Sequence, residues 1–247
     1  WIAGYQDGQI DLIKNGKIKA FPDLLSAGIS SSRKVQRIFV TQDSAWLACD
    51  FGLVLVDMRQ EVIRNSVLFS DNPLFTGQQC VDFVTFQNFG YAALSNGLYR
   101  FPLGANFKNL TLWEKINDIG AGGVRSLAVY QNQLVYLKND QTDSIMRWAP
   151  GQSPQLVNTG QSSPIRSLRT SQNRLLVVAD ESVKTLNSSW QVDFSYSEAF
   201  GPFREAVISK EGEIFAASDR RGLVIISQNG ATGGPPGPET KNVYDLK

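Results

Sequence analysis

Short apolar runs alternate with polar turns along the whole chain, and one phrase recurs. The stretch AWLACDFGLVLVD (45–57) has an aromatic anchor, small or apolar residues, a polar turn that ends in Gly and a second apolar run, and GYAALSNGLYRFP (90–102) repeats this order. The phrase occurs six times, and the anchor residues of its copies are Ile2, Trp46, Tyr91, Leu134, Leu175 and Ile214. A period of about 40–45 residues with strand-like content predicts propeller blades rather than helical repeats.

Each unit divides into four predicted antiparallel strands, which is the composition of a propeller blade. The first strands are VQRIFVTQ (35–42), VDFVTFQ (81–87), VRSLAVYQ (124–131), IRSLRTSQ (165–172) and REAVISKE (204–211). Each ends in a tight turn, at Gln42-Asp43, Gln87-Asn88, Gln131-Asn132, Gln172-Asn173 and Glu211-Gly212. The turn between the second and third strands ends at Gly8, Gly52, Gly97 or Gly222, where a positive φ is expected. The units of Leu134 and Leu175 lack that glycine, so their turns must differ.

The fourth strands and the chain ends complete the expected architecture. Fourth strands are predicted at KIKAFP (17–22), VIRNSV (62–67), LTLWEKI (110–116), PQLVNT (154–159) and WQVDFSY (190–196). The first unit begins at its second strand, and the last shows no clear fourth strand. We expect an all-β propeller over residues 1–228 with six visible blades, or seven if a leading blade precedes them. Residues 229–247 then form a Gly/Pro-rich linker followed by VYDLK (243–247), which either closes the ring or starts a following propeller. A β-sandwich or barrel is the alternative. FPDLLSAGIS (21–30) is the one place where a short helical turn is expected.

The amino-acid composition and the net charge exclude several classes of function. Apolar residues make up 42% of the chain, and 24 basic against 23 acidic residues leave a net charge of +1, which disfavours a nucleic-acid partner. The 247 residues include no histidine, which excludes Ser-His-Asp and Cys-His triads and His-ligated zinc. No transmembrane run, signal peptide, P-loop or dinucleotide fingerprint is present. Cys49 and Cys80 are expected as small buried hydrophobes, with a bridge between them left open.

Several phrases together resemble a known family. IAGYQDGQIDLI, DFGLVLVDMRQEVI, SNGLYRF and GPETKNVYDL resemble the N-terminal β-propeller of PorZ proteins, accessories of type IX secretion in Bacteroidetes. The short anchor-to-Gly-Leu phrase is also similar to the sensor propellers of two-component regulators. The PorZ resemblance implies a non-catalytic protein of the periplasm or outer cell surface that engages protein partners and anionic lipopolysaccharide. The second resemblance implies a ligand-sensing periplasmic propeller.

Three arginines form the candidate ligand site. Arg125, Arg166 and Arg204 occupy equivalent positions at the start of three first strands, so stacked blades would bring them together at the channel mouth. Guanidinium groups suit carboxylate or phosphate groups on a ligand. The alternative is that they pair with nearby acids such as Asp82, Glu205 or Asp118.

The remaining polar and aromatic residues predict structure rather than chemistry. Asp7, Asp50 and Asp219 recur before the turn glycines, where capping is favoured over calcium binding. The pairs Asp180-Glu181 and Asp7 with Asp11 are expected to be solvated rather than catalytic, and no metal or cofactor is expected. The aromatic residues expected to pack between blades are Trp46, Tyr91, Trp113, Trp148 and Phe215. Trp190, between polar neighbours, is expected to be partly exposed.

Overall fold

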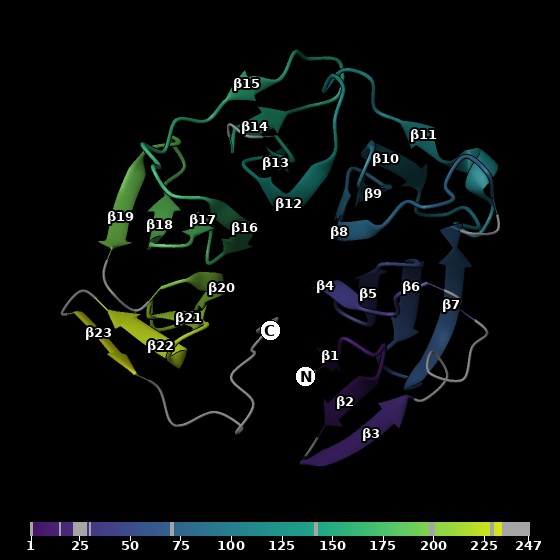
Figure 1. The fold of residues 1–247 in the computed structure, drawn as a ribbon, viewed down its shortest axis with the longest axis horizontal. Coiled ribbons are helices and arrows are strands. Elements are labelled where there is room, and N and C mark those ends of the chain that lie inside the picture. Colours follow the sequence, from purple (N-terminus) through teal and green to yellow (C-terminus); the bar gives the residue numbers. More distant parts are fainter. Residues whose placement is uncertain are drawn as a thin grey trace. The chain divides into compact units, whose positions relative to one another are not determined.

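The computed structural model describes residues 2–14, 16–21, 29, 31–69, 72–140, 143–197, 201–227 and 230–233. Within these residues the regular structure is antiparallel β-sheet, apart from the short 3-10 helix η2 (Leu110–Leu112). Five sheets have four strands and one has three (Figure 1). The fold class expected from the sequence, a β-propeller of four-stranded blades, is confirmed.

The chain divides into two compact units, Trp1–Arg125 and Ser126–Lys247. Unit 1 holds three complete sheets, and the first residues of β12 belong to it as well. Its strands are β1 (Ile2–Gly4), β2 (Ile10–Lys14) and β3 (Lys17–Phe21) in the first sheet, β4 (Val35–Val40), β5 (Ser44–Cys49), β6 (Gly52–Asp57) and β7 (Val62–Leu68) in the second, and β8 (Cys80–Phe86), β9 (Phe89–Leu94), β10 (Gly97–Pro102) and β11 (Glu114–Lys115) in the third.

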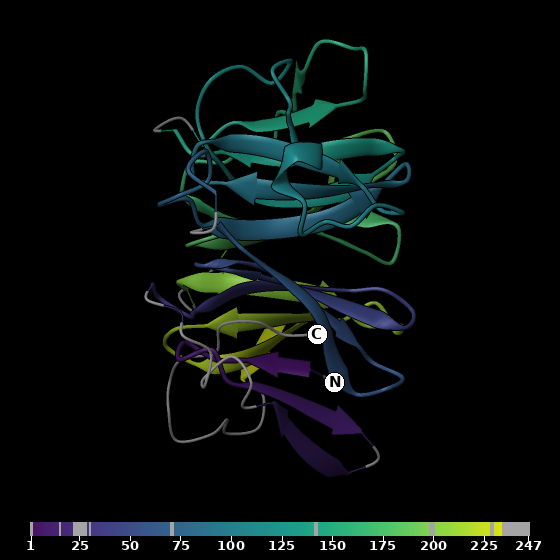
Figure 2. The same ribbon diagram turned by 90° about the vertical axis from the view of Figure 1, so that its right-hand side faces the viewer.

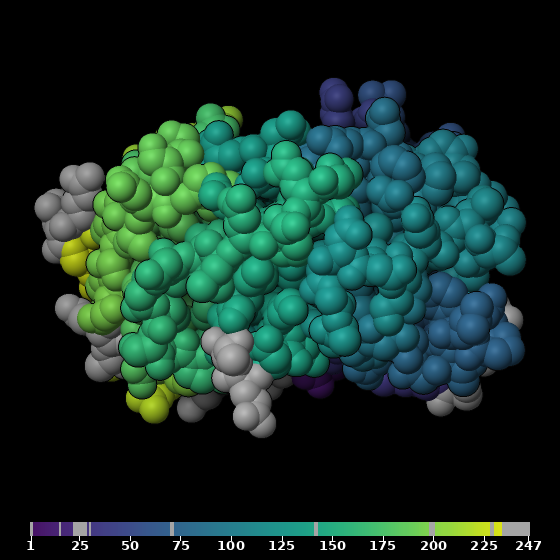
Figure 3. All heavy atoms as spheres, turned by 90° about the horizontal axis from the view of Figure 1, so that it is seen from above, coloured from purple at the N-terminus to yellow at the C-terminus, as the bar shows by residue number. Residues whose placement is uncertain are grey.

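Unit 2 holds the other three sheets. Its strands are β12 (Val124–Tyr130), β13 (Gln133–Lys138), β14 (Ile145–Trp148) and β15 (Gln155–Leu156), then β16 (Ile165–Ser171), β17 (Arg174–Ala179), β18 (Ser182–Leu186) and β19 (Val192–Ser197), and finally β20 (Phe203–Ile208), β21 (Ile214–Ser218), β22 (Gly222–Ser227) and β23 (Gly230–Gly233). In Figure 3 the light-green atoms belong to this unit, where β19 presents mostly exposed side chains.

The fourth strands depart from expectation in two places. The last sheet has a fourth strand after all, because the backbone of β23 pairs with β22 from Gly230 opposite Ser227 to Gly233 opposite Val224. In the third sheet, LTLWEKI gives η2 followed by the two-residue strand β11 (Figure 2). The indole of Trp113 is buried there and donates to the carbonyl oxygen of Phe107 at 2.8 Å, which turns the chain inward. Residues 22–28, 30 and 234–247, where we expected the short helical turn and VYDLK, lie outside the described residues.

Three of the five tight turns expected between first and second strands have both residues in the left-handed region, whereas Gln42-Asp43 has neither and Glu211-Gly212 has only Gly212 there. Gln87-Asn88, Gln131-Asn132 and Gln172-Asn173 all have positive φ angles, between 46° and 64°. Two successive left-handed residues form the hairpin turn whose twist matches that of the strands, and Asn is favoured in that region. The second-turn glycines also have positive φ, at 89° for Gly8, 152° for Gly52, 154° for Gly97 and 69° for Gly222.

The core lies between neighbouring sheets of each unit. The second strands are buried along nearly their whole length, as strands covered on both faces must be. In unit 1 the core is aromatic: Trp46 stacks on Phe83 with ring centroids 4.8 Å apart, and Phe101 stacks on Trp113 at 4.7 Å. Packing between sheets is confirmed for Trp46 and Trp113, whereas Tyr91 and Trp148 are buried and Phe215 is half-buried.

The two cysteines are free thiols, both fully buried. Burial raises the pKa of each thiol above its ordinary value because the thiolate would lose its hydration. We therefore expect neither Cys49 nor Cys80 to react with a thiol reagent such as DTNB in native buffer at mildly alkaline pH. After unfolding in guanidinium without reductant, two thiols per chain should be titrated. A rapid native reaction, or no reaction after unfolding, would contradict this expectation.

Candidate functional site

Four of the first strands, β4, β8, β16 and β20, have a β-bulge near their start. The register against the second strand shifts by one residue at Val35/Arg37, Cys80/Asp82, Ile165/Ser167 and Phe203/Glu205. A bulge inserts one residue that has no partner opposite it and locally re-aims its side chain. The inserted residues are Gln36, Val81, Arg166 and Arg204. Two of the three arginines predicted as site residues therefore occupy bulge positions.

Three of the four bulge side chains, those of Gln36, Arg166 and Arg204, contact an aspartate that follows the second strand. Arg166 forms a side-on pair with Asp180. Its Nε donates to Asp180 Oδ1 and its Nη2 donates to Asp180 Oδ2, both at a distance of 2.5 Å. Arg204 forms the same pair with Asp219, with Nε donating at 2.9 and 2.8 Å.

Unit 1 repeats this contact with an amide in place of the guanidinium. Gln36 donates from Nε2 to Asp50 Oδ1 at 2.5 Å. Of the aspartates for which turn capping was favoured over calcium binding, Asp50 and Asp219 accept a hydrogen bond from the bulge side chain.

Arg166 and Arg204 belong to one electrostatic cluster in unit 2. The hydrogen bonds from Arg166 to Asp180 raise the pKa of the Arg166 guanidinium, whereas the positive charge of Arg204 lowers it and the negative charge of Asp143 raises it. Asp143 also accepts the backbone N–H of Ile165 at 3.0 Å. We call these five residues the arginine rim: Arg166, Arg204, Asp143, Asp180 and Asp219. Arg125 is the last residue of unit 1, so the convergence of all three arginines stays a prediction.

A buried polar layer lies directly beside the bulges. Glu205 is 1% exposed, accepts the Ser167 hydroxyl at 3.0 Å and pairs with Arg169 at 3.2 Å. In unit 1, Arg37 and the buried Asp82 pair at 3.6 Å. Ion pairing, the alternative considered for the rim arginines, is confirmed for Arg166 and Arg204 through Asp180 and Asp219, whereas Asp82 and Glu205 serve these inner pairs.

The other acidic candidates stabilise the turn between β1 and β2. Asp7 Oδ1 accepts the backbone N–H of Gln9 at 3.0 Å, as expected of a turn-capping residue. Asp11 accepts the Tyr5 hydroxyl at 2.9 Å, and this bond raises the pKa of Tyr5. Among the residues that the structure describes, no group of three His, Cys, Asp or Glu side chains is placed to hold a metal ion.

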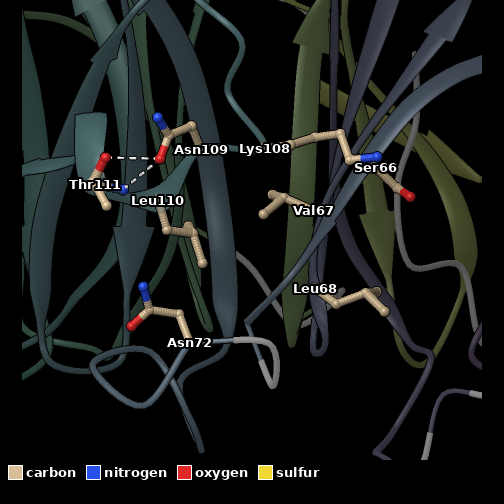
Figure 4. A pocket seen from close by; sticks show the side chains of 8 residues that line it. All are labelled: Ser66, Val67, Leu68, Asn72, Lys108, Asn109, Leu110 and Thr111. Atoms are coloured by element: carbon tan, nitrogen blue, oxygen red, sulfur yellow. Dashed lines mark hydrogen bonds between the residues drawn. The ribbon is translucent and has the colours of Figure 1, made fainter.

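A pocket of about 370 Å³ opens beside the outer strand β7 of unit 1. Its lining residues are Ser66, Val67, Leu68, Asn72, Lys108, Asn109, Leu110 and Thr111. Figure 4 shows the Lys108 side chain extending toward Ser66, with Leu110 and Val67 facing the space between them. Asn109 Oδ1 is occupied locally, because it accepts the Thr111 hydroxyl at 2.7 Å. Sequence reasoning missed this pocket because its two walls are about 40 residues apart in the chain.

Trp190 is half-buried, as its polar neighbours suggested. Its ring meets Tyr130 edge-on at 5.1 Å and lies under the Arg147 guanidinium at 4.7 Å. These contacts give Trp190 a packing role in unit 2.

Comparison with known proteins supports the resemblance seen in the sequence. Residues 1–114 match the family model of the N-terminal β-propeller domain of PorZ, of the type IX secretion system. The first part of the chain is PorZ-like. A search of curated proteins finds no match. No helix among the described residues is long and apolar enough to cross a membrane.

Solved structures share the fold. PorZ, an essential surface component of the type IX secretion system of Porphyromonas gingivalis, matches with a TM-score of 0.77 at 17% identity, over 97% of this chain and 31% of PorZ. The extracellular domain of a putative one-component system of B. thetaiotaomicron gives 0.65 at 11% identity, over 100% of this chain and 34% of that one. The extracellular domain of a putative hybrid two-component system of B. thetaiotaomicron matches with a TM-score of 0.64 at 10% identity, over 99% of this chain and 36% of that one. The chain thus spans about a third of the length of these proteins.

Proposed function

We propose that this chain is a non-enzymatic binding module of the bacterial envelope, a PorZ-like accessory of type IX secretion that engages proteins, anionic lipopolysaccharide or both. The observation that carries the proposal is the match of residues 1–114 to the PorZ N-terminal propeller family. The lack of histidine is consistent with a role in binding rather than catalysis. With a PorZ-like role, we expect the protein in the periplasm or on the outer cell surface.

The arginine rim, together with Arg125, is the proposed contact for anionic groups. A side-on pair uses Nε and one Nη of a guanidinium, so the second Nη group of Arg166 lies outside its pair with Asp180. That group has two further N–H donors, which suit a carboxylate or phosphate oxygen of a ligand. Because Arg166 and Arg204 are each about two-fifths exposed, a large ligand can reach them.

The triple variant Arg125→Ala, Arg166→Ala, Arg204→Ala tests this contact. We expect its affinity for an anionic polysaccharide, measured by calorimetry at low salt, to fall by about tenfold or more, since each lost charge-assisted bond is worth about 1.5–3 kcal/mol. Binding by the unaltered protein should also weaken as salt is added.

Arg174→Ala is the matched control for the triple variant. Arg174 pairs with Asp193 at 3.4 Å with similar exposure, but lies at the opposite end of the same sheet. Its replacement should leave the affinity unchanged. An unchanged affinity in the triple variant would remove the arginine contact from the proposal, and protein partners would remain to be tested by co-purification from envelope fractions.

The second candidate is a ligand-sensing periplasmic propeller of a hybrid two-component regulator. The shared fold of the two B. thetaiotaomicron extracellular domains favours it. The gene sequence beyond residue 247 separates the two candidates. A membrane helix and a kinase would support sensing, whereas further propeller and secretion-type domains would support the PorZ-like role.

A further inference from the structure

Three lysines line one small pocket at the outer edge of the first sheet. The pocket has a volume of about 340 Å³ and is lined by Leu12, Lys14, Lys17, Lys19 and Glu61. We call it the lysine pocket. All five residues belong to unit 1, and none belongs to the arginine rim.

The strand register puts the three lysines on one face of the β2–β3 hairpin. Lys14 lies directly opposite Lys17, and Leu12 lies opposite Lys19. Alternate residues of a strand share a face, so Lys17 and Lys19 point to the same side as Lys14. Like charges placed directly opposite each other destabilise a sheet. The hairpin therefore carries a repulsion that needs a negative charge nearby.

Glu61 supplies one such charge from the turn between β6 and β7. Its carboxylate binds Lys14 at 3.1 Å and Lys19 at 3.7 Å, and its backbone oxygen accepts Lys19 Nζ at 2.8 Å. The bond from Lys14 lowers the pKa of Glu61, which keeps it charged. Glu61 has a φ of 56°, an uncommon conformation for a side chain of this size. The glutamate thus fixes two of the lysine ammonium groups in place.

The charges of the lysine pocket do not balance. Three lysines and one glutamate leave a net charge of +2 on the lining residues. Lysines on an exposed edge strand are commonly a protection against pairing with other chains. That explanation covers Lys17 and Lys19 of β3 but not Lys14, which lies on the inner strand β2.

We propose that the lysine pocket is a binding site for a doubly charged tetrahedral oxyanion, a phosphate or phosphomonoester group. Such a group carries close to two negative charges at neutral pH, which match the excess of the lining. Its oxygens accept hydrogen bonds from the ammonium groups, each of which has three donors. The buried Leu12 side chain, 2% exposed, borders this group.

The test is a titration of the protein at low salt, followed by amide chemical shifts and by calorimetry. The probes are inorganic phosphate, glucose 6-phosphate and, as a singly charged comparison, glucuronate. We expect saturable shifts confined to residues of the β2–β3 hairpin and the Glu61 turn with both phosphates, and binding of glucuronate that is weaker by about tenfold or more. Tighter binding of glucose 6-phosphate identifies a phosphate carried on a sugar as the ligand, and equal binding identifies the free ion.

Two variants separate the site from a general attraction of anions. Lys17→Gln, at an exposed position, should weaken phosphate binding by about tenfold. Lys210→Gln, on an exposed turn of unit 2, should leave it unchanged. Equal effects of the two variants, shifts elsewhere in the chain or equal binding of glucuronate would overturn the proposal. Loss of phosphate binding in Lys17→Gln would leave polysaccharide binding at the arginine rim unaffected, so the two sites are tested separately.

Discussion

Replacing Gly52 by alanine is expected to lower the free energy of unfolding by about 3 kcal/mol or more. Gly52 is buried at the start of β6 with a φ of 152°, which side chains rarely adopt. A Cβ atom there would lie 2.0 Å from the carbonyl oxygen of Val67 on β7, so one of the two strands must move. That movement weakens the pairing of β6 with β7, which begins at Gly52 opposite Leu68.

Gly222→Ala is the matched control for this prediction. Gly222 occupies the same turn in the last sheet with a φ of 69°, and an added Cβ would have no atom within 4 Å. Its cost should be near the ordinary price of a left-handed side chain, about 1–2 kcal/mol. Urea unfolding followed by circular dichroism compares the two variants. Equal destabilisation would show that the contact with Val67 does not decide the role of Gly52.

Replacing Phe101 by alanine is expected to destabilise unit 1 by about 3–5 kcal/mol. Phe101 is 1% exposed and lies among four rings, with centroid distances of 4.7 Å to Trp113, 5.8 Å to Phe107, and 6.0 Å to both Trp46 and Phe83. Its removal leaves a cavity that these rings cannot close without losing their stacking. The near-ultraviolet circular dichroism of the cluster should fall along with the melting temperature.

Phe89→Ala serves as the control for Phe101→Ala. Phe89 is half-buried on the neighbouring strand β9, where it lies under the Arg100 guanidinium at 4.7 Å. Because its ring is partly hydrated already, the cost should be about 1 kcal/mol, with a nearly unchanged near-ultraviolet spectrum. Equal losses in the two variants would mean that the aromatic cluster does not stabilise unit 1 in the way described.

The blade pattern could be predicted because local and tertiary preferences agree. Pairs such as Gln87-Asn88 and Gln131-Asn132 mark turns in which both residues are left-handed, and the apolar runs beside them pair as strands. The strand β23 was missed because Gly-Ala-Thr-Gly has little strand preference of its own. Its backbone hydrogen bonds to β22 are formed regardless of side chains.

The candidate sites were less accessible from sequence. The rim arginines were found as a repeated position, but their partners Asp180 and Asp219 were not. The bulge that aims each arginine depends on register, which single residues do not reveal. The aspartate directly after three of the second strands, at Asp50, Asp180 and Asp219, was the available signal. The lysine pocket joins β2 to Glu61, which follows Lys14 by 47 residues, and no local pattern connects them.

The bulge residue of the first strands can vary in chemical type without changing how the strand pairs with its neighbour. Backbone geometry and the buried neighbours hold the bulge, while its own side chain contributes little to the core. The sheets accordingly carry an amide at Gln36, an isopropyl group at Val81 and guanidinium groups at Arg166 and Arg204 on one scaffold. We therefore expect substitutions at these positions to change what a sheet can bind with little loss of stability, and we expect most members of a library randomised at these codons to fold.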